Sequence, residues 1–246
     1  MISSENHIKP LAKRVLGLFG LRPVQPVQVL YLDRLNLAFL VVGKNGCSSV
    51  KESFVSTAFG DLDLPFEKVH KYMSKNREVL EGHGLQIHAF SSRRKLGSFL
   101  EGKSLLVIQR PVLARVKSAW GDYKTAKNKM IFPVFPDYSL KRCRDPRWDF
   151  NQFVEVICGI NDLLSDRHYR SQSFFWDAIP DGCQLIKLNL NELQEGFSRH
   201  LLLSELVPPR QRNRSLNAPD AEISPTLVNL LKERYAEDIR QGIPLA

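Results

Sequence analysis

Lys44 lies in a short turn whose neighbours could together bind an anion. The turn Gly43-Lys44-Asn45-Gly46 follows an apolar run from Leu37 to Val42, and a helical pattern starts near Ser48. A buried strand, a tight turn and a helix N-terminus direct free backbone N–H groups and the positive end of the helix dipole at a ligand. Lys44 adds a full charge, and the hydroxyls of Ser48 and Ser49 add hydrogen-bond donors. The stretch predicts an anion cradle, and a purely structural strand–turn–helix corner is the alternative.

The order of these residues differs from that of the commonest phosphate loop. That loop has four residues between its first glycine and a Gly-Lys-Ser/Thr ending. Here the lysine comes early, and the hydroxyls follow Lys44 by four and five residues. This order resembles the 5′-phosphosulfate loop of sulfotransferases, typically Pro-Lys-x-Gly-x-Ser/Thr-Ser. Lys44, Gly46, Ser48 and Ser49 match that loop, and Gly43 replaces its usual proline.

Arg110 and Ser118 form a second candidate anion site. Arg110 follows the apolar run Ser104–Ile108, and Ser118 lies eight residues later, in a predicted helix. A guanidinium forms bidentate, charge-assisted hydrogen bonds with a phosphate, and a hydroxyl adds one more. The pair therefore predicts a phosphate clamp. The alternative is a solvated arginine at a strand end and a serine on a helix surface.

The second stretch is similar to the 3′-phosphate motif of sulfotransferases. Four residues match the later part of that motif: Arg115, Ser118, Ala119 and Trp120. Arg110 is followed directly by Pro111, whereas the family has one residue between them. With both motifs in the family's order and at its separation, the chain resembles the carbohydrate sulfotransferases, the branch that includes Golgi chondroitin and HNK-1 sulfotransferases and bacterial relatives. The likeness spans roughly residues 36–240, with weaker matches at 166–172 and 234–238.

This resemblance implies transfer of the sulfuryl group of 3′-phosphoadenosine 5′-phosphosulfate to a hydroxyl of a carbohydrate or glycoconjugate, on a P-loop-like sulfotransferase fold. It implies that Lys44 meets the charge that develops on the leaving oxygen, and that Arg110 and Ser118 hold the 3′-phosphate. The 5′ side of the donor would contact Lys44, Asn45, Gly46, Cys47, Ser48 and Ser49. The chemistry requires no metal, and the sequence shows no cluster of metal ligands.

The acceptor hydroxyl needs a base, and two histidines are the catalytic candidates beside Lys44. His168 lies in an aromatic–polar loop, and His70 lies on the helix that follows the cradle. An acidic residue is the third candidate for the base. Structural or solvated positions explain the remaining histidines better: His7, His83, His88 and His200.

Composition restricts the class of protein and its partners. The chain has 246 residues, a formal net charge of +9 and a pI of about 9.5, which favours anionic partners. Its four cysteines form no Cys-x-x-Cys pair and no disulfide framework, so a reducing compartment fits best. No apolar run reaches the roughly 18–20 residues of a membrane span, and no secretory signal is evident. We therefore expect a cytoplasmic, bacterial protein without a transmembrane segment.

Apolar runs that alternate with helical patterns predict an α/β fold. Strands are expected at 37–42, 85–90, 104–108 and 183–190, with helices between them. This alternation predicts a three-layer parallel sheet with flanking helices, and ligands bind at the carboxyl ends of such strands. We expect residues 1–34 to form an N-terminal extension and residues 35–246 a single catalytic domain. The Pro-, Lys- and aromatic-rich segment 124–147 suggests a long, partly irregular insertion of the kind that shapes an acceptor mouth.

Two other functional classes compete with sulfuryl transfer. A nucleotide-dependent kinase could use the same cradle, but the sequence lacks the Gly-Lys-Ser/Thr ending and an evident magnesium-binding aspartate. A non-enzymatic, basic nucleic-acid-binding module is suggested only by the net charge, and no reader motif is visible. We therefore expect a carbohydrate or other hydroxyl acceptor, anionic ones included, and no nucleic-acid partner. The sequence leaves the identity of the acceptor and the oligomeric state open.

Overall fold

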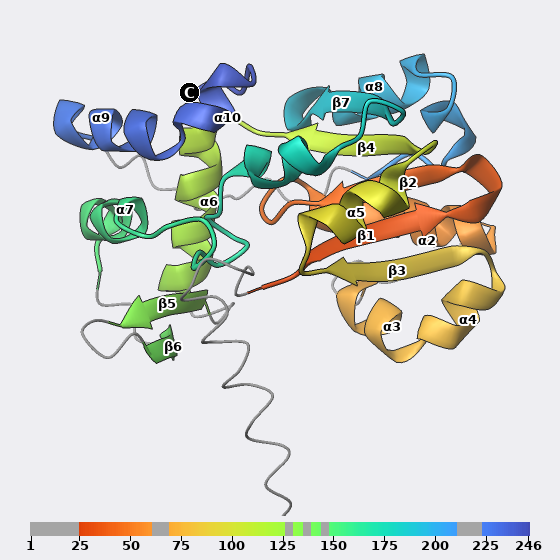
Figure 1. Cartoon of the computed structure of the whole chain (residues 1–246), viewed down its shortest axis with the longest axis horizontal. Coiled ribbons are helices and arrows are strands. Elements are labelled where there is room, and N and C mark those ends of the chain that lie inside the picture. Colours follow the sequence, from red (N-terminus) through yellow and green to blue (C-terminus); the bar gives the residue numbers. More distant parts are fainter. Residues whose placement is uncertain (1–24, 61–68, 126–129, 135–138, 144–147, 211–222) are drawn as a thin grey trace, which may run out of the picture. The chain divides into compact units, whose positions relative to one another are not determined.

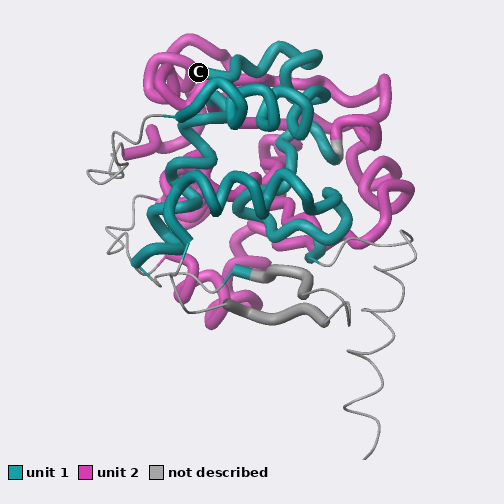
Figure 2. The backbone as a smooth tube through the Cα atoms, turned by 90° about the vertical axis from the view of Figure 1, so that its left-hand side faces the viewer, with its two compact units in different colours: residues 1–26, 111–174, 217–246 teal, residues 27–110, 175–216 magenta. Residues whose placement is uncertain are grey.

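The computed structural model describes residues 25–60, 69–125, 130–134, 139–143, 148–210 and 223–246. Most of the segment expected to form an N-terminal extension, residues 1–24, lies outside them. The chain forms two compact units, coloured separately in Figure 2. Unit 1 comprises Met1–Pro26, Pro111–Phe174 and Asn217–Ala246, and unit 2 comprises Val27–Arg110 and Phe175–Leu216.

Unit 2 contains an open five-stranded sheet with flanking helices (Figure 1). Its strand order is β3-β1-β2-β4-β7, where the strands are β1 Val27–Leu32, β2 Leu37–Val41, β3 Leu85–Phe90, β4 Ser104–Gln109 and β7 Gln184–Asn189. The four predicted strands are confirmed. The sheet is mixed, however, because β1 runs antiparallel to both β2 and β3, whereas β2, β4 and β7 run parallel. The prediction of a parallel sheet was therefore wrong for β1.

The connection after β1 explains its direction. Only the 3-10 turn η1 Asp33–Leu35 and Asn36, which adopts a left-handed φ of 47°, separate β1 from β2. So short a link permits an antiparallel pair, whereas a parallel pair needs a crossover of a dozen or more residues. β1 falls in the range that the sequence assigned to an N-terminal extension, yet it pairs along its length with the strand before the cradle.

Helices cover both faces of this sheet. They are α2 Cys47–Phe59, α3 Val69–Lys75, α4 Arg77–Gly82, α5 Arg93–Leu100 and α8 Leu193–Arg199. In Figure 1, α5 lies in front of β1 and α2 lies behind the sheet. On one face, Phe39 and Leu106 of the sheet join Phe54 of α2 and Phe197 of α8 in a buried core. Residues that alternate with these along the strands, such as Leu105, are also buried, as expected for a sheet covered on both sides.

Unit 1 is built mainly from helices. They are α6 Val112–Lys124, α7 Phe150–Cys158, α9 Pro225–Arg234 and α10 Ala236–Arg240, and an antiparallel hairpin joins β5 Met130–Val134 to β6 Ser139–Cys143. α7 packs against α6 and α9. A capping box between Asp149 and Gln152 fixes the start of α7. The described part of the segment predicted as a partly irregular insertion contains the paired strands β5 and β6.

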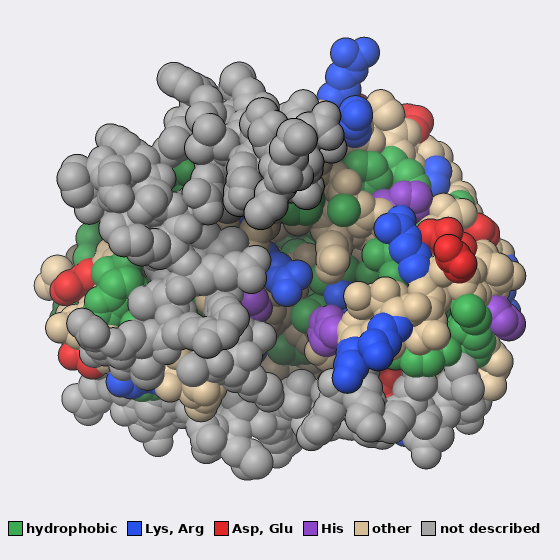
Figure 3. Space-filling view, turned by 90° about the horizontal axis from the view of Figure 1, so that it is seen from below, with side chains coloured by type: hydrophobic (Ala, Val, Ile, Leu, Met, Phe, Trp, Pro, Cys, Tyr) green, Lys and Arg blue, Asp and Glu red, His purple; other side chains and the backbone are tan. Residues whose placement is uncertain are grey.

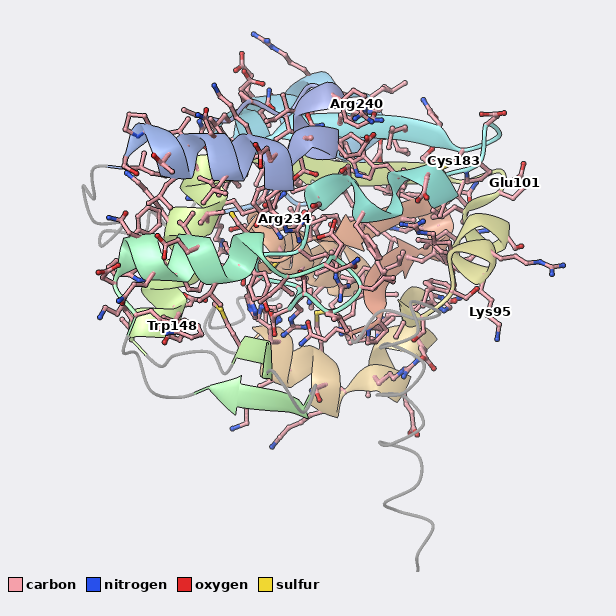
Figure 4. All side chains as sticks on the ribbon, turned by 60° about the vertical axis from the view of Figure 1, so that its left-hand side comes forward. Lys95, Glu101, Trp148, Cys183, Arg234 and Arg240 are labelled. Carbon is pink, nitrogen blue, oxygen red and sulfur yellow. The ribbon has the colours of Figure 1, made fainter. Side chains whose placement is uncertain are left out.

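A buried polar network ties the C-terminal helices to the segment around His168. Arg234, labelled in Figure 4 at the end of α9, forms an ion pair with Asp162 and donates to the Ser171 hydroxyl over 3.0 Å. Tyr235 donates to the Tyr169 carbonyl over 2.6 Å. The 3-10 helix η3 Gln172–Ala178 and Asp238 of α10 extend this network, since the carboxylate accepts from the Gln172 and Ser173 amides over 3.0 and 2.7 Å.

The Arg234 charge changes the ionisation of Asp162. Burial alone would raise the pKa of this carboxyl, but the charge of Arg234 and the hydrogen bonds from Arg234 and Ser171 lower the pKa below its ordinary value. A carboxyl whose folded-state pKa is lowered stabilises the fold above its unfolded pKa, and that contribution is lost as the pH falls through the folded pKa. The pair therefore stabilises unit 1 near neutral pH.

Arg234→Met should lower the free energy of unfolding by about 2–4 kcal/mol at pH 7, because it leaves a largely buried carboxylate unpaired. Urea unfolding at a series of pH values measures this loss. The difference from the unmodified protein should shrink as the pH falls below the ordinary aspartate pKa of about 3.9.

Arg240→Met is the matched control, since Arg240 pairs with Glu237 on the surface, where the two side chains are 71% and 47% exposed. Such a pair contributes at most about 1 kcal/mol. Equal losses for the two variants would contradict a structural role for the Arg234–Asp162 pair.

Candidate functional site

The turn between β2 and α2 has a strained backbone. Lys44 has a φ of 69° and Gly46 a φ of 70°, both in the left-handed region. A non-glycine residue in this region costs on the order of 1–3 kcal/mol, and such residues cluster at functional sites. At Gly46 a side chain is also excluded by contact, because a Cβ atom would lie 2.5 Å from Leu190 Cδ1. The turn therefore holds Lys44 at the carboxyl end of β2 in a backbone conformation that is unfavourable for a non-glycine residue.

Two side chains fasten this turn to the neighbouring strand β4. Asn45, which is 1% exposed, donates from Nδ2 to the Ile108 carbonyl over 2.7 Å. Arg110, directly after β4, donates from Nη1 to the Lys44 carbonyl over 3.0 Å. Because β2 and β4 are parallel neighbours, their carboxyl ends share one edge of the sheet. The structure therefore brings Lys44 and Arg110, which are far apart in the sequence, to the same edge.

The N-terminus of α2 faces this turn without a side-chain cap. Its N-cap is Gly46, which has no side chain to accept a hydrogen bond from the first-turn amides of Ser48 and Ser49. The first intrahelical bond runs from Val50 N to the Gly46 carbonyl over 3.2 Å. Helix N-termini with such amides attract anions through both the N–H groups and the helix dipole. Ser49, the other predicted hydroxyl donor, is buried.

His70 lies beside the first turn of α2. Its Nε2 is 2.9 Å from Ser48 Oγ, and its Nδ1 is 3.4 Å from Lys51 Nζ. Lys51 is 5% exposed and also donates to Gln28 Oε1 over 3.3 Å. Sequence reasoning placed His70 near the cradle but missed Lys51, although its spacing of three residues from Ser48 puts both on one helix face.

Ser118 and His168 belong to unit 1, and each is described within that unit. Ser118 is buried in the middle of α6. On the same helix, buried Arg115 donates to the Arg167 carbonyl over 3.1 Å, directly before His168. Burial lowers the pKa of the Arg115 guanidinium. Trp120, also on α6, donates to the carbonyl of Trp148 over 3.3 Å.

His168 forms a pair with a buried carboxylate. Its Nδ1 is 2.5 Å from Asp166 Oδ1, and the two side chains are 12% and 0% exposed. The same carboxylate accepts from the His168 backbone amide over 3.0 Å and, through Oδ2, from Gln25 Nε2 over 3.1 Å. An ionised carboxylate only accepts, so Nδ1 carries the proton and Nε2 keeps its lone pair in the neutral ring. The spacing Asp-x-His could have predicted Asp166 as the partner of His168, but the sequence analysis did not use it.

Basic side chains and histidines are prominent on the face of the described residues shown in Figure 3, in agreement with the positive net charge.

Within the described ranges, no group of three His, Cys, Asp or Glu side chains could hold a metal ion. No helix in the part of the chain that the structure describes is long and apolar enough to cross a membrane.

Comparisons with known proteins give no family for this chain. No family model, curated protein or solved structure matches it. A function for the two groups of residues around Lys44 and His168 is therefore inferred from their own chemistry and geometry.

Proposed function

We propose that this protein is a sulfotransferase that moves the sulfuryl group of 3′-phosphoadenosine 5′-phosphosulfate to a hydroxyl of a carbohydrate or glycoconjugate. One observation carries the proposal: the hydrogen bond from Arg110 to the Lys44 carbonyl puts the basic residues of the two candidate anion sites at one sheet edge, beside the N-terminus of α2. The strand–turn–helix corner at β2 and α2 supports a P-loop-like fold of the sulfotransferase type.

The residues of unit 2 are suited to the donor end of this reaction. The donor supplies an activated sulfuryl group, whose sulfur–oxygen bond to the nucleotide phosphate breaks as the acceptor oxygen bonds to sulfur. Lys44 would stabilise the negative charge that grows on the leaving phosphate oxygen. The first-turn amides of α2 and the Ser48 hydroxyl would donate to the sulfonate oxygens, and Arg110 would hold the 3′-phosphate.

His168 is the proposed base for the acceptor hydroxyl. Asp166 holds its ring with Nε2 unprotonated, so this nitrogen can take the proton that the hydroxyl loses. The arrangement matches the general pattern in which a carboxylate orients a catalytic imidazole and stabilises its charged form. Ser118 is proposed as a second ligand of the 3′-phosphate, as the resemblance implies.

Ligand-dependent melting tests the proposed function directly. Adenosine 3′,5′-bisphosphate should raise the melting temperature, because a ligand that binds only the native state stabilises it by mass action. ATP with magnesium and duplex DNA are the comparison ligands. A shift with ATP and magnesium alone would favour a kinase, and a shift with DNA alone would favour a nucleic-acid-binding protein.

Lys44→Ala should lower turnover by roughly 10²-fold or more, with a much smaller loss of donor affinity, because the charge that Lys44 meets develops mainly in the transition state. Transfer of labelled sulfate to a glycan array gives the turnover, and calorimetry with adenosine 3′,5′-bisphosphate gives the affinity. Lys71→Ala, at an exposed lysine of α3, is the control. Weaker binding with unchanged turnover would reassign Lys44 to ground-state binding.

Arg110→Ala should weaken adenosine 3′,5′-bisphosphate far more than adenosine 5′-phosphate, by about 2–5 kcal/mol, because a guanidinium–phosphate pair is lost. Calorimetric titration with both nucleotides measures the difference. Equal losses would mean that Arg110 acts only through its hydrogen bond to the Lys44 carbonyl and does not recognise the 3′ group.

His168→Ala should reduce turnover by ~10²–10⁴ and leave nucleotide affinity intact, as expected for the loss of a general base. Asp166→Asn should reduce turnover by a smaller factor through the wrong ring tautomer. His83→Ala, at an exposed histidine of unit 2, is the control. Full turnover in the His168→Ala variant, with its melting temperature unchanged, would show that another group accepts the proton.

A further inference from the structure

The contacts of His70 define which of its ring nitrogens carries a proton. A lysine ammonium is only a donor of hydrogen bonds, so the contact of 3.4 Å between Lys51 Nζ and His70 Nδ1 makes Nδ1 the acceptor. In the neutral ring the proton then sits on Nε2. Nε2 lies 2.9 Å from Ser48 Oγ, so the ring donates to this hydroxyl oxygen.

The buried position of Lys51 strengthens this assignment. Its side chain projects from α2 and is 5% exposed, and Gln28 Oε1 of β1 accepts a second hydrogen bond from its Nζ over 3.3 Å. A long side chain held at both contacts cannot turn away from the ring without losing them. Lys51 therefore keeps the Nδ1 lone pair of His70 engaged and disfavours a proton there.

The hydrogen bond from His70 directs the hydroxyl of Ser48. A serine hydroxyl has one proton to donate and accepts through its oxygen. With the oxygen already accepting from Nε2, the remaining proton of Ser48 is available to a negatively charged partner. Ser48 lies in the first turn of α2, beside the amides that follow Gly46, so an anion held there would receive this proton together with the amide hydrogen bonds.

We propose that His70 is a positioning residue and not the acceptor base: it presents Ser48 as a hydrogen-bond donor to the bound anion, and Lys51 fixes the ring tautomer that this requires. The identification of the anion as the 5′-phosphosulfate group rests on the proposed function. The relay from Lys51 through His70 to Ser48 does not, because it is made entirely of contacts within unit 2.

A double-mutant cycle in nucleotide affinity tests the relay. His70→Phe should weaken binding of the donor 3′-phosphoadenosine 5′-phosphosulfate, measured without acceptor, roughly tenfold, the scale of one well-placed hydrogen bond to a charged group. His70→Gln should retain most of the affinity, because its side-chain amide can also donate to the Ser48 oxygen. In a Ser48→Ala background, His70→Phe should have no further effect, since residues that act through one another are not additive.

A base at His70 would give the opposite pattern. His70→Phe and His70→Gln would both lose turnover with unchanged nucleotide affinity, and their effects would add to that of Ser48→Ala. Unchanged nucleotide affinity in His70→Phe would overturn the proposal, and so would effects that add to that of Ser48→Ala. Lys51→Met should weaken the nucleotide as His70→Phe does, and Lys71→Met, at an exposed lysine of α3, is its control. Melting temperatures of all variants show that they are folded.

The ring spectrum of the ligand-free protein separates this proposal from the proposed function. In ¹⁵N-labelled protein, long-range proton–nitrogen correlations should show His70 with a bare Nδ1 and a protonated Nε2, with the signals assigned by their absence in His70→Gln. Ser48→Ala should shift the Nε2 signal. A proton on Nδ1 would overturn the relay, whereas failure of the unmodified protein to bind adenosine 3′,5′-bisphosphate would overturn the sulfotransferase assignment alone.

Discussion

The hydrogen bond from Asn45 to the Ile108 carbonyl, 2.7 Å long and buried, is the contact on which the candidate site depends. It ties a turn with left-handed residues on either side of Asn45 to the neighbouring strand β4. Such a backbone persists only where its surroundings fix it. Because β4 runs parallel to β2, the same edge also delivers Arg110 to the Lys44 carbonyl. The lysine, the helix N-terminus and the arginine are thus placed by one structural constraint.

In unit 2, features set by residues close together in the sequence could be predicted, whereas features set by contacts between distant residues could not. The β2–turn–α2 corner was predictable, because a continuous apolar run followed by glycines is a local signal. β1 was missed because Val27–Leu32 mixes polar with apolar residues directly after Pro26, and only its pairing with β2 and β3 makes it a strand. The role of Asn45 was equally invisible, since its acceptor lies on another strand.

In unit 1 the chemistry around His168 depends on partners distant in sequence. The pair with Asp166 is local and could have been inferred from its spacing, but the elements that hold it could not. Arg115 of α6 donates to the carbonyl of Arg167, and Tyr235, between α9 and α10, donates to that of Tyr169, so both neighbours of His168 are held by residues distant in the sequence. These contacts fix the backbone on both sides of the His168 ring. The buried polar network holds this non-helical segment through contacts with Arg234 of α9 and Asp238 of α10.

Helix α2 buries polar side chains at positions where apolar ones would cost less to desolvate. A helix packed against a sheet usually turns an apolar face inward, but α2 also buries Lys51, Glu52 and Ser53. Each of these has a partner. Ser53 donates to the Val207 carbonyl over 2.5 Å, and Glu52 lies 3.9 Å from Arg210. Apolar residues would pack here at lower desolvation cost, whereas polar ones fix the helix and the segment 207–210 to each other. These buried polar contacts thus hold α2, the helix that follows the Lys44 turn, to the segment 207–210.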